Sequence, residues 1–222
     1  MLRTLVTLTL AVVAVSQDAA VRSRPLPKPL KLHLGCNFRD FGPEWVHIDG
    51  AIFPHIHSHN VTALPFANGS VSLIYASHLF AYFDRDEAPA VLAEWKRVMA
   101  PGGTLRLAVP DFGAVAQLYA KGSVGLDTFV SMLYGKWSVG NAAPGTPPIY
   151  HRTAYDEASL TRVLEDSGFS GVAAWDWRHV EHGQFDDYSQ AYWPHMAKDT
   201  GTLVSLNLEA TKPRSSEAGS EL

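Results

Sequence analysis

The strongest constraint on the fold is the order of elements between residues 71 and 111. Residues 71–77 (VSLIYAS) are rich in β-branched and aromatic residues, as a buried strand should be. An amphipathic helix follows, because apolar residues recur on one face at helical spacing: Val91, Leu92, Trp95, Val98 and Met99. A Pro-Gly-Gly turn at 101–103 is predicted to end this helix, and residues 104–109 are again strand-like. A strand, a helix and a second strand in this order predict a parallel βαβ unit.

The same alternation extends over most of the chain. Further short strands are predicted at 32–34, 46–48, 172–177 and 203–210, and further helices at 111–121, 126–134 and 156–167. Residues 141–148 form a proline- and glycine-rich loop. The pattern predicts an α/β fold with a parallel-rich sheet and helices on both faces. In such folds the ligand site lies at the carboxyl ends of the strands.

The two ends of the chain differ from this pattern. Arg3 precedes an apolar run at 5–15, and Ala14-Val15-Ser16 offers small residues for cleavage, so residues 1–16 are predicted to be a secretory signal peptide. The run is too short to span a bilayer. Residues 17–30 are a basic, proline-rich linker, 31–213 are the folded domain, and 214–222 are a disordered polar tail. The chain is expected to enter the secretory pathway; an organelle-targeted, anchored or cytoplasmic protein is the alternative.

Composition removes several classes of protein. The 222 residues are 46% hydrophobic and 18% charged, which is ordinary for a globular domain and unlike a polytopic membrane protein. With 18 basic against 22 acidic residues and no basic run, no nucleic-acid partner is expected. Cys36 is the only cysteine, which excludes an internal disulfide framework and a cysteine-rich zinc module. No membrane span is expected in the mature chain, and nothing in the sequence indicates its oligomeric state.

A glycine turn and a carboxylate are predicted to meet at one edge of the sheet. The first strand ends at Gly35 and the second ends at Asp49. A carboxylate in this place suits a ribose diol, because its two oxygens can accept from two hydroxyls. The phosphate-binding pattern G-x-G-x-x-G is missing, and the turn itself carries no basic residue. The predicted ligand is therefore a nucleoside without phosphates.

Four segments carry a likeness to a known family. LHLGCN, WVHIDG, LPFANGSVSLIYASHLFAYF and EAPAVLAEWKRVMAPGGTLRLAVPDF resemble the class I S-adenosylmethionine-dependent methyltransferases of the methyltransferase type 11 kind. The resemblance covers residues 31–213 and is most specific between 64 and 111. It implies a Rossmann-like fold with an antiparallel final strand, S-adenosylmethionine as cofactor, and methyl transfer to an acceptor, a small molecule or another, that the sequence does not identify.

The resemblance also implies roles for individual residues. Gly35 would let the backbone approach the methionine part of the cofactor, and Asp49 would hold the ribose hydroxyls. His59 or Asn60 stands where the family has an aspartate beside the adenine amino group. The implied cofactor-binding residues are Gly35, Cys36, Asn37, Asp49, Gly50, His59, Asn60, Ala76, Ser77 and His78.

Three positions depart from the family pattern. Asn37 replaces a second glycine, although asparagine tolerates a left-handed backbone better than most residues. The adenine-side aspartate is missing, although the Asn60 side-chain oxygen can accept from an amine. Ala81-Tyr82 replaces a Glu-His pair, which places the acceptor site and the activity in question. A catalytically degenerate cofactor-binding or interaction domain is therefore the alternative function.

The implied reaction is an in-line displacement at a sulfonium methyl group, which requires mainly alignment of the acceptor and exclusion of water. His78 is the best candidate for a general base if the nucleophile must lose a proton, and Asp111, Tyr150 and His151 are further candidates. The alternative is that His78 only packs under the following helix. Asp111 can equally be a helix N-cap.

A rival constellation is formed by His55, His57 and His59. Alternate residues of a strand share a face, so the three imidazoles could bind one divalent ion in a metal-dependent hydrolase. Solvated loop histidines are the favoured interpretation, and no metal is predicted. Asn60-Val-Thr and Asn68-Gly-Ser are glycosylation sequons that matter only in a secretory compartment. A glycan on Asn60 is incompatible with Asn60 facing adenine.

Overall fold

The computed structural model describes residues 26–138 and 145–214. The predicted signal peptide, linker residues 17–25, loop residues 141–144 and tail residues 215–222 lie outside the described residues. No helix within the described ranges is both long and apolar enough to cross a membrane.

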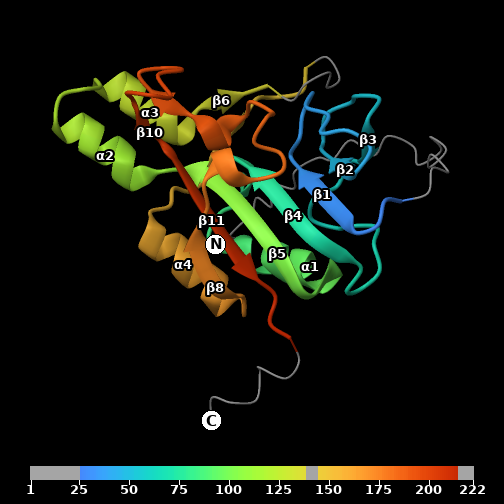
Figure 1. Cartoon of the computed structure of the whole chain (residues 1–222). Helices are drawn as coiled ribbons and strands as arrows, with labels where there is room; N and C mark the ends of the chain where they lie inside the picture. The colour runs from blue at the N-terminus through green and yellow to red at the C-terminus, as the bar shows by residue number, and fades with distance from the viewer. Residues whose placement is uncertain (1–25, 139–144, 215–222) are drawn as a thin grey trace, which may run out of the picture.

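Seven strands form the central sheet, in the order β3-β2-β1-β4-β5-β11-β8 (Figure 1). Neighbouring strands among the first five are parallel, whereas β11 is antiparallel to both β5 and β8. This mixed, mostly parallel sheet is the predicted Rossmann-like arrangement with an antiparallel final strand. The bounds are β1 Leu30–Leu34, β2 Trp45–Ile48, β3 Ile56–Ser58, β4 Val71–Ser77, β5 Met99–Pro110, β8 Ser170–Ala174 and β11 Ser205–Thr211.

The predicted helices are confirmed to within a residue or two at each end. They are α1 Ala88–Val98, α2 Phe112–Ala120, α3 Leu126–Tyr134 and α4 Glu157–Asp166. Short 3-10 helices are η1 Phe80–Tyr82, η2 Trp177–His179 and η3 Tyr188–Gln190. Two small hairpins pair β6 Lys136–Trp137 with β7 Ile149–Tyr150, and β9 Tyr192–Trp193 with β10 Thr202–Leu203.

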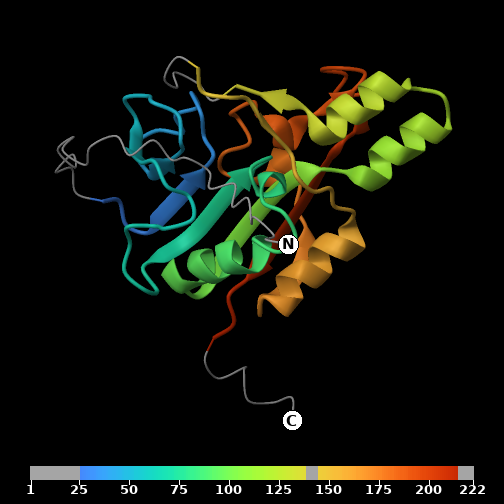
Figure 2. The same ribbon diagram turned by 180° about the vertical axis from the view of Figure 1, so that it is seen from behind.

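One face of the sheet is covered by α1 and α4, which lie in front of it in Figure 2. The main core lies between them and the strands, and it includes the fully buried Leu32, Ile74, Leu92, Trp95, Leu105 and Leu160. Burial of large apolar side chains is the main stabilising contribution to such a core. The helical spacing of the apolar residues in α1 therefore predicted which side of this helix faces the sheet.

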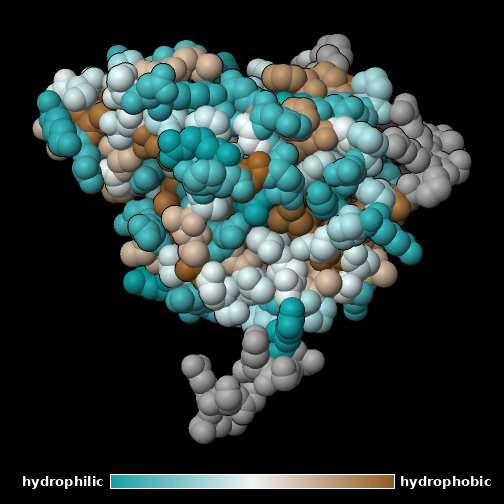
Figure 3. Space-filling view, in the orientation of Figure 1, coloured by the Kyte–Doolittle hydropathy of each residue, from teal (hydrophilic) through white to brown (hydrophobic). Residues whose placement is uncertain are grey.

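The other face is covered by residues 175–191, whose regular elements are the short 3-10 helices η2 and η3. The predicted strand 172–177 is wrong at its end, because β8 stops at Ala174. Trp175 is buried against the sheet and donates from Nε1 to the Leu107 carbonyl over 2.9 Å. The Asp176 carboxylate accepts from the backbone N–H of Arg178, which turns the chain into η2. Trp175 and Trp177 thus do not alternate along one strand. Hydrophilic residues predominate on the outside of this face (Figure 3).

The Pro-Gly-Gly sequence has a different place from the one predicted. Helix α1 ends at Val98, and residues 101–103 already belong to the first part of β5. Lys212 donates from Nζ to the carbonyls of Lys96 and Met99, at 2.7 and 2.8 Å, and so satisfies acceptors that the helix end leaves open. The turn after the helix is therefore completed by a residue from the far end of the domain.

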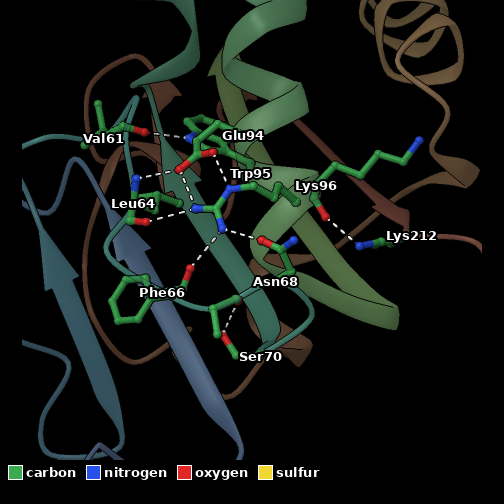
Figure 4. A network of polar contacts seen from close by, with 11 residues as sticks. Val61, Leu64, Phe66, Asn68, Ser70, Glu94, Trp95, Lys96 and Lys212 are labelled. Carbon is green, nitrogen blue, oxygen red and sulfur yellow. Dashed lines mark hydrogen bonds and ion pairs between the residues drawn. The ribbon is translucent and has the colours of Figure 1, made fainter.

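Polar side chains of α1 hold the segment that leads from β3 to β4 (Figure 4). Glu94 accepts from the backbone N–H of Leu64 at 2.7 Å, and Trp95 donates from Nε1 to the Val61 carbonyl at 2.8 Å. Arg97 donates to Glu94, to the carbonyls of Leu64 and Phe66, and to the Asn68 side chain. One guanidinium therefore supports three backbone or side-chain oxygens of the segment besides its carboxylate partner.

Replacing Arg97 by alanine is expected to lower the free energy of unfolding measurably, because several acceptors lose a charged donor at once. Arg97→Lys should recover less than half of this loss, since an ammonium cannot reproduce the fork of a guanidinium. Arg178→Ala is the control: its exposed side chain forms a surface ion pair with nearby Asp176 and lies over the Trp177 ring, and its removal should cost clearly less stability than that of Arg97. Denaturant titration measures all three, and equal losses for Arg97→Ala and Arg178→Ala would contradict the role of the network.

Candidate active site

The strand order reverses between β1 and β4, which makes the carboxyl ends of these strands the place where such a sheet binds ligands. Gly35 ends β1 with φ +69, and its N–H donates to the Ile48 carbonyl at 2.8 Å. Asn37 is also left-handed, with φ +51, so asparagine makes the turn where the family has a second glycine. The predicted glycine turn is therefore formed in spite of the departure from the pattern.

Asp49 lies at the end of β2 and holds this turn. Its Oδ2 accepts from the backbone N–H of Asn37, and its Oδ1 accepts from that of Ala51, each at 2.7 Å. Each carboxylate oxygen can accept a second hydrogen bond. The carboxylate is half-buried and is positioned by two backbone amides, so it can receive a pair of hydroxyls without rearrangement.

Gly35 lies too close to Leu79, just beyond the end of the neighbouring strand β4, to carry a side chain. A Cβ on Gly35 would lie 2.9 Å from the Leu79 Cβ, and its backbone is left-handed. Gly35→Ala is therefore expected to reduce the free energy of unfolding by about 2–4 kcal/mol, the sum of backbone strain and overpacking. Thermal denaturation measures this loss of stability. Gly50→Ala is the control, because a Cβ on Gly50 meets nothing within 4 Å. Similar stabilities for the two variants would refute the close approach.

Cys36 is fully buried inside the turn. Its Sγ lies 3.9 Å from His55 Nε2, and that nitrogen lies 3.0 Å from the Asn37 carbonyl. Burial, followed by the charge of Asp49, raises the pKa of the Cys36 thiol well above its ordinary value. The thiol thus stays protonated, which agrees with a role as a small buried side chain rather than a nucleophile.

The adenine-side residues are both exposed. His59 Nδ1 lies 3.0 Å from the Asp49 carbonyl and 3.1 Å from the Ala51 carbonyl, so this nitrogen carries the proton. The Asn60 side-chain oxygen accepts from the N–H and the hydroxyl of Thr62, at 2.9 and 2.8 Å. An adenine amine would have to share that oxygen. Contact between Asn60 and adenine stays a prediction, and so does glycosylation of Asn60 or Asn68.

The three histidines of the rival metal site are engaged separately. His55 contacts the Asn37 carbonyl, and His59 contacts backbone carbonyls. His57 stacks on Phe66 with ring centroids 5.8 Å apart, and burial lowers its pKa. Within residues 26–138 and 145–214, no three histidine, cysteine or acidic side chains are arranged to hold a metal ion. The structure thus gives the metal-dependent hydrolase no support.

His78 directly follows Ala76 and Ser77 at the end of β4. Its backbone is left-handed, with φ +50, and its N–H donates to the Ala108 carbonyl at 2.8 Å. Its Nε2 lies 3.1 Å from the Ser205 hydroxyl. Burial, followed by the nearby His151 and Arg39, lowers the pKa of His78 to about 3. At neutral pH the imidazole is therefore uncharged.

Aromatic rings surround His78. Tyr188 from η3 and His151 after β7 lie 5.3 and 6.2 Å from its ring centroid, and Tyr82 lies 4.6 Å from that of His151. Burial, then the charges of Tyr188 and Asp49, raises the pKa of Tyr82 to about 12. We call His78, Tyr82, His151 and Tyr188 the aromatic cluster.

Sequence reasoning found part of this cluster and missed the rest. In the sequence, Tyr82 stands out only as a departure from the family pattern, and no motif marks Tyr188 as part of the site. Asp111 is the N-cap of α2, accepting from the Ala114 N–H at 3.0 Å, and Tyr150 is exposed on β7. His151 Nδ1 donates to the Leu133 carbonyl at 2.8 Å. The structure thus brings His151 to His78 and leaves Asp111 in a capping role.

Known proteins resemble this chain in part of its sequence and in its fold. Residues 40–107 match the family model of a methyltransferase domain. A solved structure of S-adenosylmethionine-dependent methyltransferases from Methanosarcina mazei is 15% identical, with 83% of this chain and 92% of that chain covered and a TM-score of 0.50. The 1,6-didemethyltoxoflavin-N1-methyltransferase of Burkholderia thailandensis, solved with its substrate and S-adenosylhomocysteine, is 13% identical over 83% and 71% of the chains, with a TM-score of 0.48.

None of the curated proteins matches the chain. The family match runs from before β2 into β5, so it includes Asp49 but not the turn at Gly35, and the structural likeness concerns the fold. Together, the family match and the fold confirm the resemblance seen in the sequence to the class I S-adenosylmethionine-dependent methyltransferases.

Proposed function

We propose that this protein transfers a methyl group from S-adenosylmethionine to an acceptor bound beside the aromatic cluster. The observation that carries the proposal is the position of Asp49, whose carboxylate is held by the amides of Asn37 and Ala51 at the strand end where a ribose is expected. When bound, the cofactor supplies an electrophilic methyl group on a charged sulfur.

The residues of the site fit this cofactor. The bare backbone at Gly35 permits close approach of the methionine part, and Asp49 offers acceptors to the ribose hydroxyls. The rings of Tyr82, His151 and Tyr188 near His78 would limit the access of water to the acceptor. Acceptor identity depends on loops, including residues 141–148, so the proposal names no acceptor.

Isothermal titration of the full chain with S-adenosylhomocysteine tests the proposal. We expect saturable one-to-one binding of this product and of S-adenosylmethionine, and weaker binding of the 2′,3′-dideoxyribose analogue, which lacks the hydroxyls for Asp49. Adenosine and 2′,3′-dideoxyadenosine form a second pair that differs only in the two ribose hydroxyls, so they measure the contribution of these hydroxyls without the methionine part. Absence of binding heat and of any thermal shift at saturating concentrations would overturn the proposed function.

Turnover separates the enzyme from the degenerate alternative. A chain that binds the cofactor but transfers no labelled methyl group to any acceptor in a metabolite extract would be a binding or interaction domain. Entry into the secretory pathway is a separate proposal, based on residues 1–16, and N-terminal sequencing of the mature protein tests it.

A further inference from the structure

A chain of buried hydrogen bonds runs from η3 through β11 to His78. Asn207 donates from Nδ2 to the Ser189 carbonyl at 2.9 Å, and this contact fixes the orientation of its amide, since a carbonyl can only accept. The Asn207 oxygen is therefore the acceptor for the Ser205 hydroxyl, 2.9 Å away. Ser189, Ser205 and Asn207 are each at least 95% buried, so water does not compete for these groups.

This orientation determines where the proton of His78 lies. The Ser205 hydroxyl has one hydrogen, which goes to Asn207, so its oxygen accepts from His78 Nε2 at 3.1 Å. A neutral imidazole carries one N–H, and here it must be on Nε2. The Nδ1 atom of His78 thus carries a lone pair in place of a hydrogen.

The backbone around His78 is equally constrained. Residues Ser205 and Asn207 lie two apart on β11 and so share a face of the strand. The N–H of His78 is held by Ala108 on β5, and its ring lies beside Tyr188, the first residue of η3. Elements from three distant parts of the chain therefore converge on one imidazole.

We propose that Ser205 and Asn207 are positioning residues that hold His78 in the Nε2–H tautomer, so that Nδ1 accepts a hydrogen bond from the methyl acceptor. The inference rests on the proposed function and adds a substrate class to it. The acceptor carries a hydroxyl or N–H on its nucleophilic atom, and its apolar body packs against Tyr82 and Tyr188. A nucleophile without a hydrogen, such as a tertiary amine or thioether, would leave Nδ1 unpaired.

Nitrogen NMR of the ¹⁵N-histidine-labelled full chain tests the tautomer directly. The His78 signals are assigned by their loss in His78→Asn, a substitution chosen because asparagine tolerates the left-handed backbone. We expect a protonated Nε2 and an unprotonated Nδ1, unchanged between pH 8 and pH 5. A proton on Nδ1, or a charged ring at pH 6, would overturn the proposal, and this wild-type spectrum needs no variant to be decisive.

Variants test the part played by the serine. Ser205→Ala is expected to give a mixture of both His78 tautomers, Ser205→Thr to restore the single tautomer, and the exposed Ser70→Ala to leave the spectrum unchanged. An unaltered tautomer in a folded Ser205→Ala protein would remove Ser205 from the role. Titration with S-adenosylhomocysteine separates the two proposals: the expected tautomer without cofactor binding would overturn the function, whereas binding with the other tautomer would overturn only the inference.

Discussion

Replacing Asp49 by asparagine is expected to weaken S-adenosylhomocysteine binding about 100-fold or more. The variant loses a charged acceptor for the ribose, and hydrogen bonds to charged groups contribute about 1.5–3 kcal/mol each. It also turns an amide NH₂ toward the backbone N–H of Asn37 or Ala51, where only an acceptor fits. Isothermal titration measures the affinity.

Asp40→Asn is the matched control for this prediction. It removes the same charge from the same region, but Asp40 is exposed; its side chain accepts from the nearby Gly42 N–H, a contact that asparagine keeps, and lies 3.7 Å from His47 Nε2. Its affinity should equal that of the unmodified protein. Equal affinities for Asp49→Asn and Asp40→Asn would show that the ribose does not lie on Asp49.

Through His47, His78 and His182, acidification from pH 7 to pH 5 is expected to remove about 5 kcal/mol of folding free energy, and the buried His33, whose pKa is also lowered by burial, adds to this loss. Burial lowers the pKa of His47 to about 4 and those of His78 and His182 to about 3. The unfolded chain titrates near the ordinary value of 6.5, so it binds more protons than the native chain below that pH. Stability is therefore complete above pH 6.5 and is lost as the pH falls, by about 1.4 kcal/mol per group and pH unit.

Two of these imidazoles belong to a buried cluster on the second face of the sheet. His182 stacks on Phe41 and lies tilted against Tyr75, and His47 accepts from the Phe41 N–H at 2.9 Å. Neither ring nitrogen of His182 has a hydrogen-bond partner. The surrounding charges largely oppose one another: Asp40 raises the pKa of His47, whereas Arg106 and Lys31 lower that of His182 and Glu181 raises it.

His182→Phe should reduce the loss of folding free energy between pH 7 and pH 5 by about 2 kcal/mol, because one titrating group is removed. The readout is the difference between the free energies of unfolding at pH 7 and pH 5, since a change in packing affects both values equally. His195→Gln, at an exposed position, should leave the pH dependence unchanged. Denaturant titrations at both pH values measure these free energies of unfolding. A stability that does not fall toward pH 5 would contradict the claim that these histidines are buried and neutral in the folded protein.

The parts of the fold that depend on local pattern could be predicted. Helix α1 and strand β4 followed from apolar spacing, and the Gly35 turn followed from its place between a strand and a carboxylate. The family resemblance supplied the antiparallel β11. By contrast, the end of β8 depends on a hydrogen bond from Trp175 to Leu107, a contact across 68 residues that no local pattern encodes.

In the candidate site too, residues marked by local pattern could be predicted, and residues placed by distant contacts could not. Asp49 and His78 stand at predicted strand ends and were found, whereas the Ser205 hydroxyl lies 127 residues from His78 in the chain. Tyr188 reaches the site from the segment that replaces a helical cover on the second face. The sequence left the rival metal site of His55, His57 and His59 open, because the contacts that separate these rings come from Phe66 and from backbone carbonyls elsewhere in the chain.

Determination of the structure with S-adenosylhomocysteine bound is the most direct test of the central claim. The account predicts both ribose hydroxyls within hydrogen-bonding distance of the Asp49 carboxylate and the methionine part along the backbone at Gly35. Binding of the ribose anywhere else on the protein would contradict it.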